Sequence, residues 1–170
     1  MTIDKTALRG RLRRNLLCAL AITLLTLADQ LLKLAAAAHL QGQHKTLLPH
    51  VLGLTYVENT GAAFSMLSGH TTLLSVGTLI VLLAAAVLLF LGYFKRLFAD
   101  VCATLIIAGG LGNLIDRFAH HYVVDYIETL FVDFPVYNFA DILVVVGVFG
   151  AVGYLIWDFV RETREKKKHG

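Results

Sequence analysis

The stretch Gly109–Asp141 carries four aspartates and lies between two long apolar segments. They are Asp116, Asp125, Asp133 and Asp141. Placing an ionisable group at or near membrane depth is costly, so such groups are candidates for function. Two carboxyl groups that share one proton can activate water and protonate a carbonyl oxygen, the steps that break a peptide bond without a metal. A carboxyl pair at a membrane surface is therefore the first chemistry that these residues predict.

The segments around these aspartates are long enough to span a membrane. Of the 170 residues, 57% are hydrophobic and only 16% are charged. A helix crosses a hydrocarbon core of ~30 Å at ~1.5 Å per residue. Four apolar stretches satisfy this length, at Leu16–Ala38, Thr72–Phe94, Val101–Phe118 and Phe139–Val160. We expect residues 1–170 to form a single integral membrane domain with four transmembrane helices.

The basic residues gather on one side of this expected domain. Five precede the first span, Lys95 and Arg96 lie between the second and third, and five follow the fourth, which makes twelve of the fifteen Lys and Arg. By the positive-inside rule, both termini and the Lys95–Asp100 loop are cytoplasmic, whereas His39–Thr71 and Ala119–Tyr137 are outside. This topology accounts for the net charge of +3. We therefore expect no nucleic-acid partner.

The first outside segment is too long to be a simple connection. Within it, Val51–Val57 is rich in β-branched and aromatic residues and predicts a short strand, which could pair with an extended peptide by edge addition. Asn59 then favours a turn, and Gly61 permits close approach of another backbone. A plain turn remains the alternative role for Asn59.

A second group of polar residues lies inside the first and third spans. Asp29 and Lys33 are four residues apart on one helix and can neutralise each other. Asn113, Asp116 and Arg117 share one face of the third span. Because Arg117 is always charged, we expect it to satisfy Asp116. Both sets are interpreted as support for a site, facing protein or water and not lipid.

Asp125 and Asp141 have different surroundings. Asp125 lies in the last outside loop between apolar neighbours on both sides, and desolvation in such a frame raises the pKa of a carboxyl group. Asn138 and Asp141 open the fourth span with N-x-x-D spacing, which predicts a capping box. A helix N-terminus also favours an ionised carboxylate, so the cap does not exclude chemistry.

Topology brings four carboxylates to one level of the membrane. Asp29, Asp116 and Asp141 lie near the outer ends of three spans, and Asp125 lies in the loop between the last two. Four unrelated caps or ion pairs would not converge in this way. The residues themselves leave open whether Asp116 or Asp125 is the partner of Asp141.

The order of five motifs resembles the lipoprotein signal peptidases, the bacterial type II signal peptidases. The motifs are DQLLK (Asp29–Lys33), ENTGAAFS (Glu58–Ser65), GGLGNLIDR (Gly109–Arg117), VVDYI (Val123–Ile127) and YNFAD (Tyr137–Asp141). The resemblance covers nearly the whole chain. Tyr137 precedes Asn138 where Phe is more usual, which leaves Asn138 and Asp141 in place.

This resemblance implies an aspartic endopeptidase that cleaves prolipoproteins just before a diacylglyceryl-modified cysteine. It implies Asp125 and Asp141 as the catalytic dyad and a small β-cradle in the first outer loop. The positions that it implies as substrate-binding or supporting are Asp29, Lys33, Asn59, Gly61, Asn113, Asp116, Arg117 and Asn138. No metal or cofactor is required. We expect a monomer in the bacterial cytoplasmic membrane, in contact with membrane lipid and with its site at the extracytoplasmic face.

Functions of other classes remain as alternatives. A small four-helix transporter could use Asp29 and Asp141 as proton or cation sites. A metal-dependent membrane hydrolase could use His120, His121 and Asp125. An inactive scaffold would leave the converging carboxylates unexplained. The transporter would predict ligand-coupled flux in proteoliposomes, and the metal enzyme would be sensitive to chelators.

Overall fold

The computed structural model describes residues 5–61, 71–94 and 96–169, and it contains four long helices and one small sheet. The elements in chain order are α1 (Lys5–His39), β1 (His44–Leu48), β2 (Leu52–Asn59), α2 (Thr71–Leu91), α3 (Leu97–His120), β3 (Val123–Thr129) and α4 (Phe139–His169). All four helices are long and apolar enough to cross a membrane. The predicted fold class, a four-helix membrane protein with a small sheet, is confirmed.

The helices extend beyond the apolar stretches at several ends. α1 begins eleven residues before Leu16 and α4 continues to His169, because Lys, Arg and Glu are good helix formers that need not stay in the membrane. α2 instead ends earlier than predicted. Gly92 adopts a left-handed φ of 76°, and the N–H of Tyr93 donates to the carbonyl of Leu88, which closes the helix.

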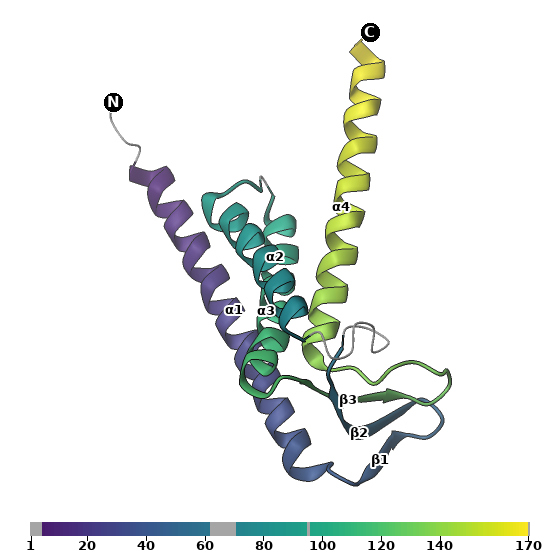
Figure 1. Cartoon of the computed structure of the whole chain (residues 1–170). Helices are drawn as coiled ribbons and strands as arrows, with labels where there is room; N and C mark the ends of the chain where they lie inside the picture. The colour runs from purple at the N-terminus through teal and green to yellow at the C-terminus, as the bar shows by residue number, and fades with distance from the viewer. Residues whose placement is uncertain (1–4, 62–70, 95, 170) are drawn as a thin grey trace.

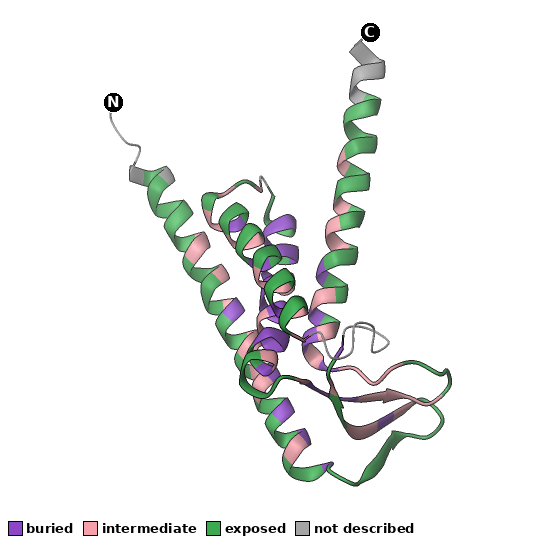
Figure 2. Cartoon of the chain, viewed as in Figure 1, coloured by how far each residue is buried: buried purple, intermediate pink, exposed green. Residues whose placement is uncertain are grey.

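The two ends of the molecule differ (Figure 1). The start of α1, the end of α4 and the connection between α2 and α3 lie at one end of the helices, and the three strands lie at the other. α3 packs against each of the other three helices. Buried residues gather on α3 and on the parts of α1 and α4 near the sheet, whereas much of α1, α2 and α4 is exposed (Figure 2). Their outward leucines and valines suit contact with lipid.

Three glycines allow α3 to approach its neighbours closely. A Cβ at Gly109 would collide with the carbonyl oxygen of Ala140 on α4. A Cβ at Gly110 would lie 2.5 Å from the Leu82 side chain on α2, and one at Gly112 would collide with the carboxylate of Asp29 on α1. Close approach through small residues is how membrane helices associate. α3 is therefore the element against which the polar groups of α1 and α4 are placed.

The strands form one antiparallel sheet in the order β1-β2-β3. The predicted strand at Val51–Val57 corresponds to β2. The prediction that the first outer loop builds the sheet is incomplete, because β3 comes from the segment after α3. β2 is the central strand, so edge addition of a peptide is restricted to its part beyond Thr55, where β1 has ended. The pairing of β2 with β3 places Val57 opposite Asp125.

A buried ammonium group joins α1 and α3. Lys33 Nζ lies 2.9 Å from Asp29 Oδ2, 3.0 Å from Asp116 Oδ2 and 2.9 Å from Asn113 Oδ1. The side chains of Lys33 and Asp29 are 3% and 0% exposed. Asp29 Oδ1 accepts a hydrogen bond from the N–H of Ala140, which adds α4 to the cluster. The predicted pair of Asp29 and Lys33 is confirmed.

The predicted pairing of Asp116 with Arg117 is wrong. Asp116 bonds instead to Lys33, to Gln30 Nε2 at 3.0 Å and to the N–H of Val124 at 3.1 Å. Successive residues on a helix are rotated by about 100°, so Asp116 points to α1 and β3 whereas Arg117 points elsewhere. Asp116 thus connects α3 to both of these elements.

We predict that Asp29→Asn destabilises the fold. The substitution removes one of the two carboxylates that balance Lys33 inside the protein, and breaking a buried pair costs about 3–5 kcal/mol. Because Asp116 remains 3.0 Å from Lys33, we expect the lower part of this range. Thermal unfolding in detergent, followed with a thiol-reactive dye that reaches buried Cys102 only on unfolding, should show a lower Tm.

The matched control is Asp133→Asn, the same chemical change at an exposed position. Its Tm should equal that of the unaltered protein. An Asp29→Asn protein with unchanged Tm and no cleavage activity would contradict a structural role for Asp29. It would indicate that Asp29 takes part in the reaction.

Candidate active site

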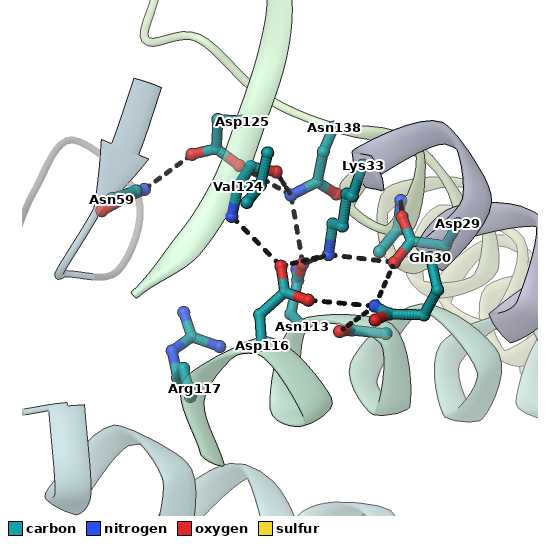
Figure 3. Close-up of polar contacts among 12 residues, drawn as sticks. Asp29, Gln30, Lys33, Asn59, Asn113, Asp116, Arg117, Val124, Asp125 and Asn138 are labelled. Atoms are coloured by element: carbon teal, nitrogen blue, oxygen red, sulfur yellow. Dashed lines mark hydrogen bonds and ion pairs between the residues drawn. The ribbon is translucent and has the colours of Figure 1, made fainter. Parts of the chain in front are cut away.

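The candidate site lies where the C-terminal end of α3, the start of β3 and the first turn of α4 meet (Figure 3). Asp125 lies on β3 and only 2% of its surface is exposed, whereas Asp141 in the first turn of α4 is half-buried. The prediction that Asp125 lies in a loop is wrong. Strand pairing holds its backbone, so the side chain is placed by the sheet.

Both oxygens of Asp125 accept hydrogen bonds from amides. Asn59 Nδ2 donates to Oδ2 at 2.9 Å, and Asn138 Nδ2 donates to Oδ1 at 2.6 Å. Burial raises the pKa of Asp125 to about 6, and the nearby Asp141 carboxylate adds to the rise. The two amide hydrogen bonds and the charge of Lys33 act in the opposite direction and limit this rise. The desolvation predicted from the apolar neighbours of Asp125 is confirmed.

Asp141 and Asn138 form a reciprocal cap at the start of α4. The N–H of Asp141 donates to Asn138 Oδ1 at 3.0 Å, and the N–H of Asn138 donates to Asp141 Oδ2 at 3.1 Å. The predicted capping box is confirmed, with Asn in place of Ser or Thr. The other carboxylate oxygen of Asp141 accepts from Asn113 Nδ2 at 2.7 Å.

Two asparagines connect the two carboxyl groups. Asn138 Nδ2 lies within 3.1 Å of Asn113 Oδ1 as well as bonding Asp125, and Asn113 Nδ2 bonds Asp141. Lys33 has only donors, so its bond to Asn113 Oδ1 requires the amide nitrogen of Asn113 to face Asp141. The buried ammonium therefore determines which group is presented to the carboxylate.

Asn59, Gly61 and Arg117 border the site on the side of β2. Asn59 Oδ1 accepts from the N–H of Gly61 at 2.9 Å, which is the predicted turn, while its amide nitrogen bonds Asp125. Arg117 Nη2 donates to the carbonyl of Gly61 at 3.2 Å. Arg117 Nε is buried and has no hydrogen-bond partner among the described residues. Residues 62–65 of the Glu58–Ser65 motif lie outside the described residues.

Asp125 and Asp141 line one cavity of about 670 Å³, named here the site cavity, between α2, α3, α4 and residues 134–137. Asn59, Asn113 and Arg117 also belong to its polar lining. Its walls further along the helices are apolar, with Leu82 on α2, Ile106 on α3 and Val144 on α4 among them. The cavity is not lined by Asp29, Lys33 or Asp116. These three residues are buried behind its lining residues and keep them in position. The arrangement can hold an apolar chain with a peptide bond near two carboxyl groups.

One supporting residue was not predicted. Gln30 donates to Asp116 Oδ1 at 3.0 Å and to the carbonyl of Gly112 at 3.1 Å, which ties α1 to α3 beside the ion cluster. Its signal in the sequence is the polar stripe that Gln30 shares with Thr26 and Lys33 on the first span. Of the alternative metal ligands, His120 stacks on Tyr122, and among the described residues no three His, Cys, Asp or Glu side chains form a metal-binding group.

Comparison with known proteins relates this chain to one family of membrane enzymes. The family model of signal peptidase (SPase) II matches residues 21–159. A lipoprotein signal peptidase of Lactococcus lactis subsp. cremoris (strain MG1363) is 44% identical over 140 residues, which cover 79% of this chain and 89% of the relative. A lipoprotein signal peptidase of Enterococcus faecalis (strain ATCC 700802 / V583) is 42% identical over 117 residues, covering 69% of this chain and 73% of the relative.

A solved structure of a bacterial membrane enzyme superposes with a TM-score of 0.78 at 34% identity, covering 84% of this chain and 88% of that one. A second structure of the same description gives a TM-score of 0.73, also at 34% identity, with 81% of this chain and 91% of that one covered. These relatives give no support to the alternative of a transporter. The chain is a protease and belongs to the signal peptidase II family.

Proposed function

We propose that Asp125 and Asp141 are the catalytic dyad with which this signal peptidase II removes signal peptides from prolipoproteins. Cleavage falls immediately before a diacylglyceryl-modified cysteine. The observation that carries the proposal is that both carboxyl groups line the polar end of one apolar cavity and are joined through Asn113 and Asn138. Asp29, by contrast, has both oxygens bonded away from this cavity.

The dyad works with one proton between its two carboxyl groups. The ionised carboxylate takes a proton from a water molecule as the water oxygen attacks the scissile carbonyl carbon. The protonated carboxyl group gives its proton to the carbonyl oxygen, which forms a tetrahedral diol. The proton taken from water then passes to the leaving nitrogen as the C–N bond breaks. One hydroxyl of the diol returns its proton to the carboxylate that had protonated the carbonyl oxygen, which gives the carboxylic acid product and restores the single proton of the dyad. The titration belongs to the pair, so neither residue has a fixed role at rest.

The site cavity suits a substrate that is apolar on both sides of the bond to be cut. Leu82, Ile106 and Val144 offer walls for the apolar helix of a signal peptide or for acyl chains. Arg117 and Asn59 lie at the polar end, where they can bond to the peptide backbone or to ester carbonyls. The remaining supporting residues hold Asp125 and Asp141 in position.

We expect Asp125→Asn and Asp141→Asn each to lower the cleavage rate by at least ~10²-fold, since each removes a group that transfers a proton. The double variant should be little slower than either single variant, because groups that act as a unit lose their effect together. The assay is conversion of a purified lipidated prolipoprotein to the shorter product on a gel. Asp133→Asn is the control and should keep full activity. If Asp125→Asn cleaved the substrate while a folded Asp116→Asn protein did not, the catalytic partner of Asp141 would be Asp116 and not Asp125.

The pH dependence follows from the raised pKa of Asp125, which burial moves to about 6. As Asp125 loses its proton above that pH, the pair loses its proton donor, so kcat/KM should fall about tenfold per pH unit. The hydrogen bond from Asn59 lowers the pKa of Asp125, so Asn59→Ala should move this fall to higher pH. A fall of kcat/KM that stays at the same pH in Asn59→Ala would show that Asp125 does not govern it.

The proposed setting is the bacterial cytoplasmic membrane, with both termini in the cytoplasm and the sheet and site at the extracytoplasmic face. The unequal placement of Lys and Arg supports this orientation. We also propose that residues 1–170 act as one membrane domain and as a monomer.

Cysteine labelling tests this orientation. In intact cells, a membrane-impermeant maleimide should label Lys45→Cys, on exposed β1, and should not label Lys167→Cys. The unaltered protein, with Cys18 half-buried and Cys102 buried, sets the background. Labelling of Lys167→Cys but not Lys45→Cys would reverse the proposed topology.

A further inference from the structure

The sheet ends in an exposed apolar region on the side away from α1 (Figure 1). The turn between β1 and β2 meets the segment after β3 there, because the N–H of Leu130 donates to the carbonyl of Val51 at 3.0 Å. Figure 2 shows this turn and part of this segment as exposed. We name the region the sheet tip, and its exposed large apolar residues are Leu47, Leu48, Val51, Phe131, Val132 and Phe134.

The apolar side chains of the sheet tip are highly exposed. Phe131 is 70% exposed and Leu47 is 57% exposed. The first residues of β1, by contrast, are polar: they are His44, Lys45 and Thr46. A contiguous exposed apolar patch marks a site of contact with a membrane or with another protein. The sheet tip therefore has the character of a docking surface.

The sheet tip is joined through Phe134 to the surface of the membrane spans. Phe134 lines the site cavity together with Val81 on α2 and Val145 on α4. Both valines lie in helices that are apolar enough to cross a membrane, and more than half of each side chain is exposed. The apolar surface of the tip is therefore continuous with the surface that α2 and α4 present to lipid.

The direction in which the sheet extends agrees with lipid as the occupant. The strands project sideways beyond the start of α4 and not along the axis of the helices (Figure 1). A tip in this position lies over the bilayer that surrounds the spans. Lipid is present on every exposed side of the helices, whereas a second copy of the chain would need a matching apolar surface at the same level.

We propose that the sheet tip inserts into the surface of the lipid bilayer and holds the sheet against it. Apolar side chains at the boundary between headgroups and acyl chains exchange water for hydrocarbon, and the binding strengthens with the apolar area that is buried. His50 and Asp133 lie among the residues of the tip and are exposed. Because polar groups are costly within hydrocarbon, they keep the tip at this boundary and out of the centre of the bilayer.

Insertion of the tip fixes the depth of β3. This strand carries Asp125 near its start and ends at Thr129, next to the tip. The bilayer surface then holds one end of the strand, and Asp116 on α3 holds the other through the N–H of Val124. The proposal concerns the position of the sheet and does not depend on the catalytic dyad.

Quenching of tryptophan fluorescence by lipid tests the insertion. Trp157 is the one tryptophan of the chain, so Trp157→Phe gives a background without tryptophan emission. In this background, Phe131→Trp and Leu47→Trp, made in separate proteins, place a reporter on each segment of the tip. Gln41→Trp, at an exposed position between α1 and β1, is the control.

Each protein is reconstituted in phosphatidylcholine bilayers with or without bromine on the acyl chains, since bromine quenches an adjacent indole. We expect the brominated lipid to quench both reporters of the tip and to leave Gln41→Trp unquenched. The emission maximum of both reporters should also lie at shorter wavelength than that of Gln41→Trp, because an indole in hydrocarbon is shielded from water.

Two added charges should expel the tip from the bilayer. Phe131→Asp combined with Val132→Asp places carboxylates where apolar side chains are inserted, and carboxylates are costly there. The Leu47→Trp reporter should lose its quenching in this protein. Gln41→Asp combined with Gln43→Asp adds the same charge at exposed positions outside the tip and should leave the quenching unchanged. An unchanged Tm verifies that both proteins fold.

Several results would overturn the proposal. Absence of quenching at both reporters would show that the tip stays outside the bilayer. If that absence came with emission at short wavelength and with Phe131→Cys disulfides between copies, a second copy would be the occupant. Equal quenching of Gln41→Trp would show that contact with lipid is not a property of the tip.

The charged variant supplies a further decisive result. Quenching of Leu47→Trp that survives the two aspartates in a folded protein would show that the apolar side chains of the tip do not hold it in lipid. Should the two aspartates prevent folding, Phe131→Ser combined with Val132→Ser makes the same comparison without charge. Unchanged quenching in that protein would equally contradict the proposal.

Discussion

The buried ammonium of Lys33 is the group on which the other polar contacts depend. A lone charge inside a protein is very unfavourable, and here three oxygens compensate it, from Asp29, Asp116 and Asn113. Each partner then serves a second element. Asp29 accepts from the start of α4, Asp116 accepts from β3, and Asn113 turns its amide nitrogen to Asp141. One cation thus determines how three helices and a strand are arranged around the site.

This arrangement gives the two proposed catalytic carboxyl groups unequal environments. Asp125 is buried on a strand, and burial raises its pKa to about 6, whereas Asp141 is half-buried at a helix N-terminus. Division of acid and base roles requires such a difference. The asparagines between them keep the groups in fixed orientation without adding charge. Ion pairs therefore stabilise the structure behind the site, and amides position the groups within it.

Packing around α3 makes room for these polar groups in an otherwise apolar molecule. Glycines on α3 bring the backbones of α1 and α4 close at the level of the ion cluster. Further along, the helices leave the site cavity, with apolar walls and one polar end. The closely packed glycine contacts and the site cavity therefore occupy neighbouring parts of α3. The exposed leucines of α1, α2 and α4 face outward, where lipid takes the place of a protein core.

The sequence by itself determined the local features: four spans from apolar length, the pair of Asp29 and Lys33 from helical spacing, and the cap formed by Asn138 and Asp141. Each depends on residues within one turn or one segment, so periodicity suffices to predict it. Only the tertiary structure decided that Asp116 bonds Lys33 and not Arg117, and that Asp125 lies on a third strand beside Asn59. Strand pairing and charge partners join residues far apart in the chain. These contacts depend on which helices face each other, and the spacing of residues within one segment does not predict this arrangement.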